Sequence, residues 1–195
     1  MRQRWALVVL GAWISGSICT SIVATQNFYT IDRLLAHPAN GAFSAAVQQL
    51  GAPQARELLR YLSSELNRLY FEIWNWAQLV VGAVALWLIA GPTRPDPRFT
   101  RAARVVAGMI AIVVLMLVWL TPAIVSLGRE LDFVPRDPPP PGMQRFWILH
   151  AAYTSLEMLK LAAGFLVAFW IAQAPAVEEP RAVASASTGG PDRSG

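Results

Sequence analysis

The chain has 195 residues, of which 55% are hydrophobic and 14% charged, with a formal net charge of +4. Soluble domains average about 45–50% apolar and about 25% charged residues, so this composition favours a membrane protein. The basic residues are spread over several loops, which argues against nucleic acid as a partner. A single cysteine, Cys19, excludes an intrachain disulfide and a thiolate metal cluster.

The first predicted crossing is the uncharged run 5–24, which follows the basic start MRQR. Its length matches the roughly 20 apolar residues that span a bilayer. A cleaved signal peptide is the alternative, because it also combines a basic start with an apolar run. The run exceeds the usual length of about 7–15 residues, however, and Ile22 is large for a cleavage position. We therefore expect a retained helix.

The segment 53–70 in the following loop has helical spacing of its apolar residues and predicts an amphipathic helix. The apolar positions are Leu58, Tyr61, Leu62, Leu66 and Leu69. Pro53 suits a helix start, and no breaker precedes the second crossing at 69–90, so one long helix could project from the membrane. Its apolar face could pack on the loop around Phe28, Leu34 and Phe43, or dock on a partner or the membrane surface.

The remaining crossings are predicted at 102–125 and 146–172. Prolines 138–141 between them favour an extended spacer, with recognition by a proline-binding partner as the second interpretation. Residues 175–195 are rich in Ala, Ser, Gly and Pro, which predicts a disordered cytoplasmic tail. The predicted fold is all-α: residues 1–174 form a polytopic four-helix transmembrane bundle, with an additional amphipathic helix in the first extracytoplasmic loop.

Arginines set the expected orientation, because short cytoplasmic loops are enriched in basic residues. Arg2 and Arg4 precede the first crossing, and a second group lies between the second and third crossings. That group is Arg94, Arg98, Arg101 and Arg104. Both segments share one side of the membrane, so we predict cytoplasmic N- and C-termini. Most tryptophans fall near predicted span ends, where their rings prefer to lie, and Trp13 alone is mid-span.

Ionisable residues inside the last crossing are the strongest functional clue. They follow spacings of three, four and three, which places them along one helical face: His150, Tyr153, Glu157 and Lys160. The second crossing carries a comparable stripe, which continues from Glu65 and Arg68: Glu72, Asn75 and Gln78. At 1.5 Å rise per residue, Glu72, Asn75 and Gln78 lie roughly 5 to 14 Å below the outer end of their span. His150, Tyr153 and Glu157 lie roughly 6 to 17 Å below theirs, so we expect the two stripes to meet.

Two hypotheses explain this polar layer. In the structural hypothesis Glu157 pairs with Lys160, while Asn75 and Gln78 form interhelical hydrogen bonds that make the packing specific. In the alternative the protein is a small proton-coupled or solute transporter. There Glu157 accepts a proton or cation, Lys160 tunes it, and His150 with Glu72 lines a wet route.

Ridges of small residues on two crossings favour close helix packing, either inside the bundle or between copies. They are Ala12, Gly16, Thr20 and Ala24 on the first crossing, and Ala103, Ala107 and Ala111 on the third. The sequence contains no phosphate loop, nucleophile elbow, HExxH or paired CxxC, so we expect no enzymatic activity and predict no catalytic, cofactor or metal residue.

The segments FYTIDRLLAHPANGAF, LLRYLSSELNRLYFEIWNWAQLV and FWILHAAYTSLE resemble the bacterial DUF4149 or TMEM205-like membrane proteins. The resemblance covers the architecture from Trp5 to Ala172. It implies a multi-pass protein of the bacterial inner membrane, in a group without a settled biochemical activity, and it transfers no site residues. The expected partners are the lipid bilayer and either further copies of the chain or another membrane protein.

Overall fold

The computed structural model describes residues 1–91 and 96–174, which form helices and connecting segments without a strand in those ranges. The elements are α1 (Arg2–Ala36), α2 (Gly41–Leu50), α3 (Ala52–Ala90), α4 (Pro97–Leu115), the π-helical turn η1 (Met116–Leu120), α5 (Thr121–Glu130) and α6 (Met143–Ala172). Four helices are long and apolar enough to cross a membrane, the third being continuous from Pro97 to Glu130. The predicted all-α class is confirmed, and the chain is a multi-pass membrane protein. The predicted tail at 175–195 lies outside the described residues.

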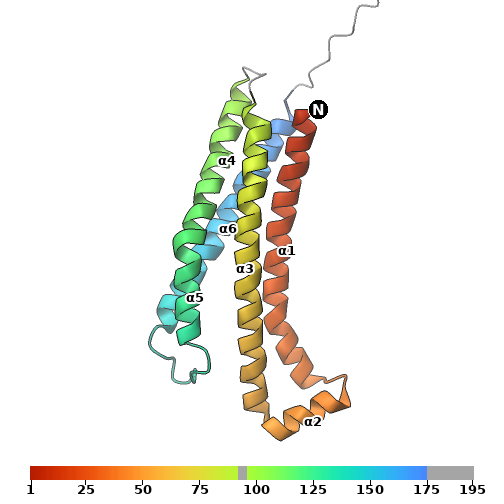
Figure 1. Cartoon of the computed structure of the whole chain (residues 1–195), viewed down its shortest axis with the longest axis vertical. Coiled ribbons are helices and arrows are strands. Elements are labelled where there is room, and N and C mark those ends of the chain that lie inside the picture. The colour runs from red at the N-terminus through yellow and green to blue at the C-terminus, as the bar shows by residue number, and fades with distance from the viewer. Residues whose placement is uncertain (92–95, 175–195) are drawn as a thin grey trace, which may run out of the picture.

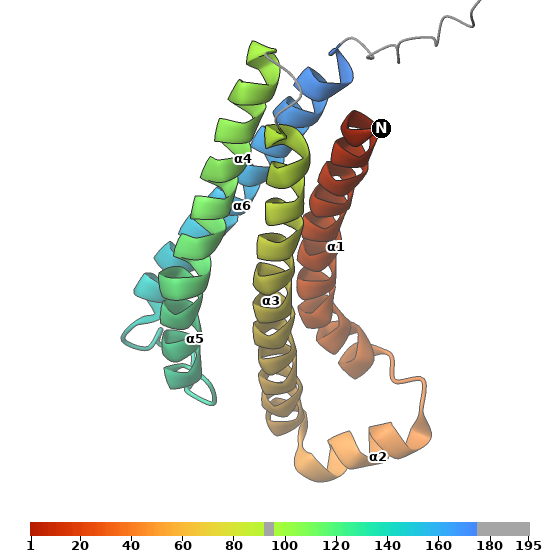
Figure 2. The same cartoon turned by 45° about the horizontal axis from the view of Figure 1, so that its top comes forward.

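The spanning helices form a closed bundle (Figure 1) in which α1 packs on α3, α3 on α4, α4 on α6 and α6 on α1. The start of α1 and the end of α6 meet at one end, where Gln3 Nε2 donates to the carbonyls of Ile171 at 2.7 Å and Ala174 at 3.0 Å. We refer to this as the terminal end and to the opposite end, crossed by α2, as the α2 end. Toward the α2 end, the α1–α3 pair diverges from α5 and α6 (Figures 1 and 2).

Helices α1 and α3 are longer than a bilayer requires. Their 35 and 39 residues correspond to roughly 52 and 58 Å, against about 30 Å of hydrocarbon. The predicted amphipathic segment 53–70 is the first half of α3, and the expected single long helix is confirmed, with Pro53 in its first turn. The separate helix α2 was not predicted. Asn40 caps it by accepting the N–H groups of Ala42 and Phe43, a frequent helix-start arrangement.

The predicted apolar positions of α3 between Leu58 and Leu69, here called the leucine stripe, are not the residues through which α3 packs on α1. The exposed members of the stripe are Leu58, Tyr61, Leu62 and Leu69. The residues buried in this half of α3 are Ala55 and Ser63, whose small side chains allow close approach to α1. Asn27 Nδ2 donates to Asn67 Oδ1 at 2.7 Å, and Asn67 Nδ2 donates to the Ala24 carbonyl at 3.0 Å. Small and polar residues therefore join the projecting parts of α1 and α3, and the leucines remain uncovered.

The terminal half of the bundle has a tightly packed core. It includes the buried residues Leu10, Trp13, Ala85, Ile89, Val106, Met109, Val113, Val167 and Ile171. Two glycines make room for tryptophan rings in this region. A Cβ at Gly16 would overlap the Trp74 ring, and a Cβ at Gly82 would lie 2.9 Å from the Trp13 ring. These glycines allow α1 and α3 to approach each other across two large side chains.

The π-helical turn η1 lies just before Pro122 in the third span. Proline has no N–H and cannot complete the regular hydrogen bond to the carbonyl four residues earlier. A π-turn at this position is a recognised cause of irregularity in long helices. Thr121 begins α5 at the end of this turn, and its hydroxyl accepts a hydrogen bond from Asn75 Nδ2 at 3.1 Å. The irregular turn thus supplies a polar contact to the bundle interior.

Candidate functional site

Gln78 of α3 is the centre of a buried polar cluster. Its side chain is fully buried, and its Oε1 accepts hydrogen bonds from Lys160 Nζ at 2.6 Å and from Trp13 Nε1 at 2.9 Å. Lys160 belongs to α6 and Trp13 to α1. A single amide oxygen therefore joins three of the four spanning helices.

Lys160 and Glu157 form a buried ion pair on α6. Lys160 Nζ lies 2.8 Å from Glu157 Oε1, and the two side chains are 2% and 8% exposed. Gln78 Nε2 also donates to Glu157 Oε1, at 3.5 Å. The second carboxylate oxygen, Oε2, is buried and has no hydrogen-bond partner among the described residues. Lys160 Nζ thus has two acceptors, Gln78 Oε1 and Glu157 Oε1, whereas one oxygen of Glu157 is left without a donor.

Asn75 extends the polar cluster toward the α2 end. Its Oδ1 accepts from Tyr153 Oη at 3.4 Å and from Gln78 Nε2 at 3.5 Å, while its Nδ2 donates to Thr121. Asn75 is fully buried and Tyr153 is 6% exposed. The cluster consists of Trp13, Asn75, Gln78, Thr121, Tyr153, Glu157 and Lys160. It links α1, α3, α5 and α6 at one level of the bundle.

Five of the sequence-predicted site residues meet in this cluster, and Glu72 and His150 lie outside it. Both of these side chains are exposed. Successive helical residues rotate by about 100°, so Glu72, six residues before Gln78, lies about 120° around α3 from it. His150 is on the same face of α6 as Glu157, but its ring packs against Phe146 and Trp147 and lines the pocket instead of joining the cluster. The prediction of the inward-facing residues is therefore correct from Asn75 to Gln78 and from Tyr153 to Lys160, and wrong for Glu72 and His150, which lie outside the cluster.

Trp13 and Thr121 are the cluster members that the sequence analysis missed. Trp13 had a signal, because it is the one tryptophan placed in the middle of a predicted span, where its N–H requires a buried acceptor. Thr121 had a weaker one, as the residue that precedes a proline inside an apolar helix. Neither signal identifies the partner, since the pairing depends on how α1 and α5 are rotated in the bundle.

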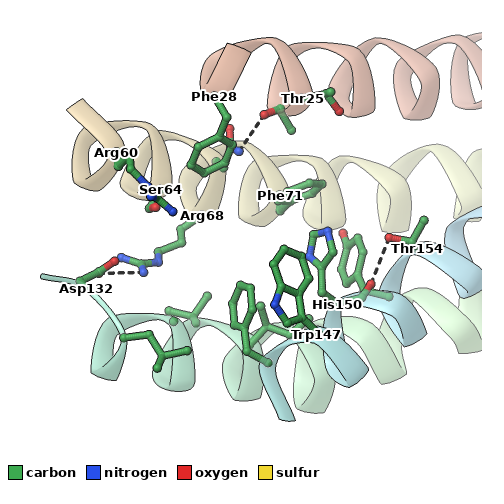
Figure 3. A pocket seen from close by; sticks show the side chains of 18 of the residues that line it. Thr25, Phe28, Arg60, Ser64, Arg68, Phe71, Asp132, Trp147, His150 and Thr154 are labelled. Atoms are coloured by element: carbon green, nitrogen blue, oxygen red, sulfur yellow. Dashed lines mark hydrogen bonds and ion pairs between the residues drawn. The ribbon is translucent and has the colours of Figure 1, made fainter. Parts of the chain in front are cut away.

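A pocket of about 890 Å³ extends from the polar cluster to the α2 end, between α1, α3, α5 and α6. Tyr153 and Glu157 lie at its inner end, and Arg60 and Arg136 line it toward the α2 end. Aromatic rings form much of its wall: Phe28, Phe71, Phe146 and Trp147. Figure 3 shows the His150 ring beside Trp147 on α6, near Phe71 of α3. The predicted polar layer is therefore next to a cavity on one side of the bundle.

Ion pairs surround the wide part of the pocket. Arg68 Nη2 lies 2.9 Å from Asp132 (Figure 3), and Arg68 also pairs with Glu65 on its own helix. Burial alone would raise the pKa of the Glu65 carboxyl, but hydrogen bonds and charges from Arg129 and Arg68 bring it below its ordinary value. The ion pair between Arg68 and Asp132 connects the first half of α3 to the segment that follows α5.

The bundle and its interior cluster define an α-helical multi-pass membrane protein with a buried charged and amide-rich layer. No family model matches the chain, and no curated protein or solved structure matches it. Within residues 1–91 and 96–174, no group of three His, Cys, Asp or Glu residues is placed to hold a metal ion.

Proposed function

We propose that the chain is a non-enzymatic protein of the bacterial inner membrane, acting as a structural subunit of an oligomer or larger membrane assembly. In this proposal the polar cluster fixes how the helices pack. The observation that carries it is the double acceptance by Gln78 Oε1 from Lys160 and Trp13, across three helices. Polar groups surrounded by apolar helices select the one arrangement that satisfies them, so they add specificity even where each bond is weak.

The orientation proposed for this protein places the terminal end in the cytoplasm. The density of arginines close to the helix ends on that side supports it, since basic residues near the spans are retained on the cytoplasmic side. These arginines include Arg4, Arg98, Arg101 and Arg104. We also propose that the protein is related to the DUF4149 or TMEM205-like group, on the basis of its four crossings and the long helical first loop.

Assembly into an oligomer is supported by small residues on the outer surface of α4. Ala107 and Ala111 are exposed, and a Cβ added at Gly108 would meet no atom within 4 Å. Of the two ridges expected from the sequence, the one on α1 is used internally at Gly16 and Ala24. The outer surface of α4 would allow another helix to approach closely.

Transport of a proton or small solute is the second candidate function. It is favoured by Glu157, which has an unpartnered buried oxygen and lies at the inner end of the pocket. In this candidate Glu157 accepts the proton or cation, Lys160 tunes it, and His150 lines the route. Glu72 has no place in this route, because it does not line the pocket. Access of water to Glu157 from the terminal end separates this candidate from the structural one.

A double-mutant cycle tests the structural proposal. Glu157→Leu leaves the Lys160 charge buried and unpaired, which costs about 3–5 kcal/mol of stability, and Lys160→Met does the same to Glu157. The double variant replaces the pair by apolar side chains and is expected to regain most of the loss. Thermal unfolding in detergent measures all three, with Glu157→Asp as the milder charge-conserving change.

The matched control for this cycle is Glu72→Leu, which removes an exposed carboxylate on α3. We expect no loss of stability from it. An unchanged melting temperature in Glu157→Leu, or additive losses in the double variant, would show that the pair does not hold the bundle together.

A further inference from the structure

We propose that the pocket between α1, α3, α5 and α6 binds an anionic amphiphile, with its phosphate or carboxylate group at Arg60 and Arg136 and its apolar chain along the aromatic wall. This inference goes beyond the structural role of the polar cluster and does not depend on it. It rests on three features of the pocket: its charge balance, its apolar wall and its position along the bundle.

The carboxylates that line the pocket are already matched by close cations. Asp32 pairs with Arg56 at 2.9 Å, Asp132 with Arg68 at 2.9 Å, and Glu157 with Lys160 at 2.8 Å. The same lining contains two further arginines, Arg60 and Arg136. Matching these pairs leaves a surplus of positive charge at the wide part of the pocket.

Arg60 and Arg136 are weakly compensated. The nearest carboxylate to Arg60 is Glu57, at 3.9 Å on the preceding helical turn. Arg136 forms no ion pair within 4 Å in the described part of the chain. Desolvation and then the charge of Arg60 lower the pKa of the Arg136 guanidinium, with Glu57 and Asp132 opposing the shift. Two arginines near each other and short of anions form a suitable site for a phosphate or carboxylate.

The apolar wall begins where these charges end. Phe28 of α1, Phe71 of α3, and Phe146 and Trp147 of α6 line the pocket toward Tyr153. Its volume of about 890 Å³ lies within the roughly 300–1,000 Å³ of small-molecule sites. An apolar cavity with a few polar groups at one end is complementary to a molecule that has an apolar chain and one charged group.

The position of the pocket fits a membrane-derived ligand. Arg60 precedes the predicted second crossing at 69–90, whereas Asn75, which accepts from Tyr153, lies inside it. The distance between these levels of α3 is 15 residues, or roughly 22 Å at 1.5 Å per residue. The charged group would lie outside the hydrocarbon and the chain within it, as in a bilayer lipid.

A bilayer phospholipid and a free fatty acid share this chemistry, and binding measurements can separate them. The purified full chain in nonionic detergent is titrated with radiolabelled phosphatidylglycerol, phosphatidylcholine, palmitate and inorganic phosphate. We expect phosphatidylglycerol or palmitate to bind at least about tenfold more tightly than phosphatidylcholine. Tenfold is about 1.4 kcal/mol, near the lower limit for a net hydrogen bond to a charged group. Whichever of the two anions binds identifies the source.

The variant pair Arg60→Gln and Arg136→Gln, made together, is expected to remove this preference. Its control is Arg101→Gln with Arg104→Gln, two exposed arginines of α4 near the terminal end. Arg136→Gln alone, in an exposed segment, provides a folded variant if the double change lowers the yield. Three results would overturn the proposal: equal binding of phosphatidylcholine, binding of inorganic phosphate as tight as that of the amphiphile, or an equal loss in both arginine pairs.

Discussion

The two halves of the bundle contrast in how the helices meet. In the terminal half, glycines at 16 and 82 allow two tryptophan rings to fill the space between helices, and the buried core is apolar. In the half near α2, the same helices diverge around a pocket with a charged rim. The polar cluster lies at the boundary. The contrast indicates that small residues bring the helices together and that the amide and ion-pair network marks where close packing stops.

This division matters because membrane helices gain little from the hydrophobic effect when they associate with each other. Their association depends on close van der Waals contact and on interhelical hydrogen bonds. The terminal half is held together mainly by van der Waals contact, and the cluster mainly by interhelical hydrogen bonds. Substitutions can weaken one kind of interaction without the other, which allows the contrast to be tested.

Gln78→Met is expected to have the largest effect among single changes outside the ion pair. It removes the acceptor of Trp13 Nε1 and one of the two acceptors of Lys160 Nζ, and each buried N–H left unsatisfied costs about 1–3 kcal/mol. We expect a total loss of about 2–4 kcal/mol in detergent unfolding. Gln26→Met, at an exposed position of α1, is the control and should leave the melting temperature unchanged. Equal melting temperatures of the two variants would show that the hydrogen bonds of Gln78 do not stabilise the bundle.

Gly16→Ala tests the tightly packed half. The added methyl group overlaps the Trp74 ring, and overpacking of this kind costs about 1–3 kcal/mol. Gly11→Ala is the matched control on the same helix, since nothing lies within 4 Å of its added Cβ. The control should be neutral or slightly stabilising, because alanine is the better helix former. A similar melting temperature for both variants would show that α1 and α3 are not closely packed there.

Asp132→Asn weakens the pocket half by removing the carboxylate that faces Arg68. The two side chains are 14% and 13% exposed, so we expect a loss of about 1 kcal/mol. Asp32→Asn breaks an ion pair of the same 2.9 Å length whose side chains are 63% and 50% exposed. Because exposed pairs contribute about 0–1 kcal/mol, this control should have the smaller effect. Reversal of that order in chemical or thermal unfolding would contradict the described burial.

The pH dependence of Glu65 should give the smallest effect. Its folded pKa is lowered by Arg129 and Arg68, so it stabilises the fold above the ordinary glutamate pKa. That contribution is lost as the pH falls through the folded value. The wild type should therefore lose slightly more melting temperature between pH 6 and roughly pH 3.5 than Glu65→Gln does. Parallel pH profiles would show that the carboxylate is not stabilised by its arginines.

Much of the fold was predictable because the spans depend on composition and length. The four crossings and the continuity of 53–90 follow from apolar runs and the absence of a breaker. Helix α2 was missed because GAFSAAVQQL is only ten residues long, and Asn40, which caps its start, is the signal that could have identified it. Two alternatives were open for the apolar positions at 58–69, packing on the first loop or docking on a partner or the membrane surface. Most of these positions are exposed, because α1 packs on the face of α3 that carries Ala55 and Ser63.

The polar cluster was predictable in part. Spacing placed Glu157 and Lys160 on one face and Gln78 at a matching depth, and the structure brings these groups within hydrogen-bonding distance. Depth and spacing did not determine which part of each stripe reaches the cluster. Glu72 is rotated by about 120° around α3 from Gln78, and the His150 ring packs against Phe146 and Trp147 of its own helix. The second contact depends on side-chain packing that the stripe itself does not record.

Labelling of position 157 tests most directly whether the cluster seals the bundle. Glu157→Cys is combined with Cys19→Ser, and with Lys160→Met so that no unpaired charge remains, and folding is verified by unfolding in detergent. A membrane-impermeant thiol reagent is then added to each side of oriented vesicles. Because Glu157 lines the pocket that extends to the α2 end, the decisive result is access from the terminal end. The structural account predicts no labelling from that side, and a cysteine at the exposed Ala45 of α2 identifies the side of the vesicle that carries the α2 end. Labelling of position 157 from the terminal side would reveal an aqueous path through the cluster and contradict the sealed arrangement.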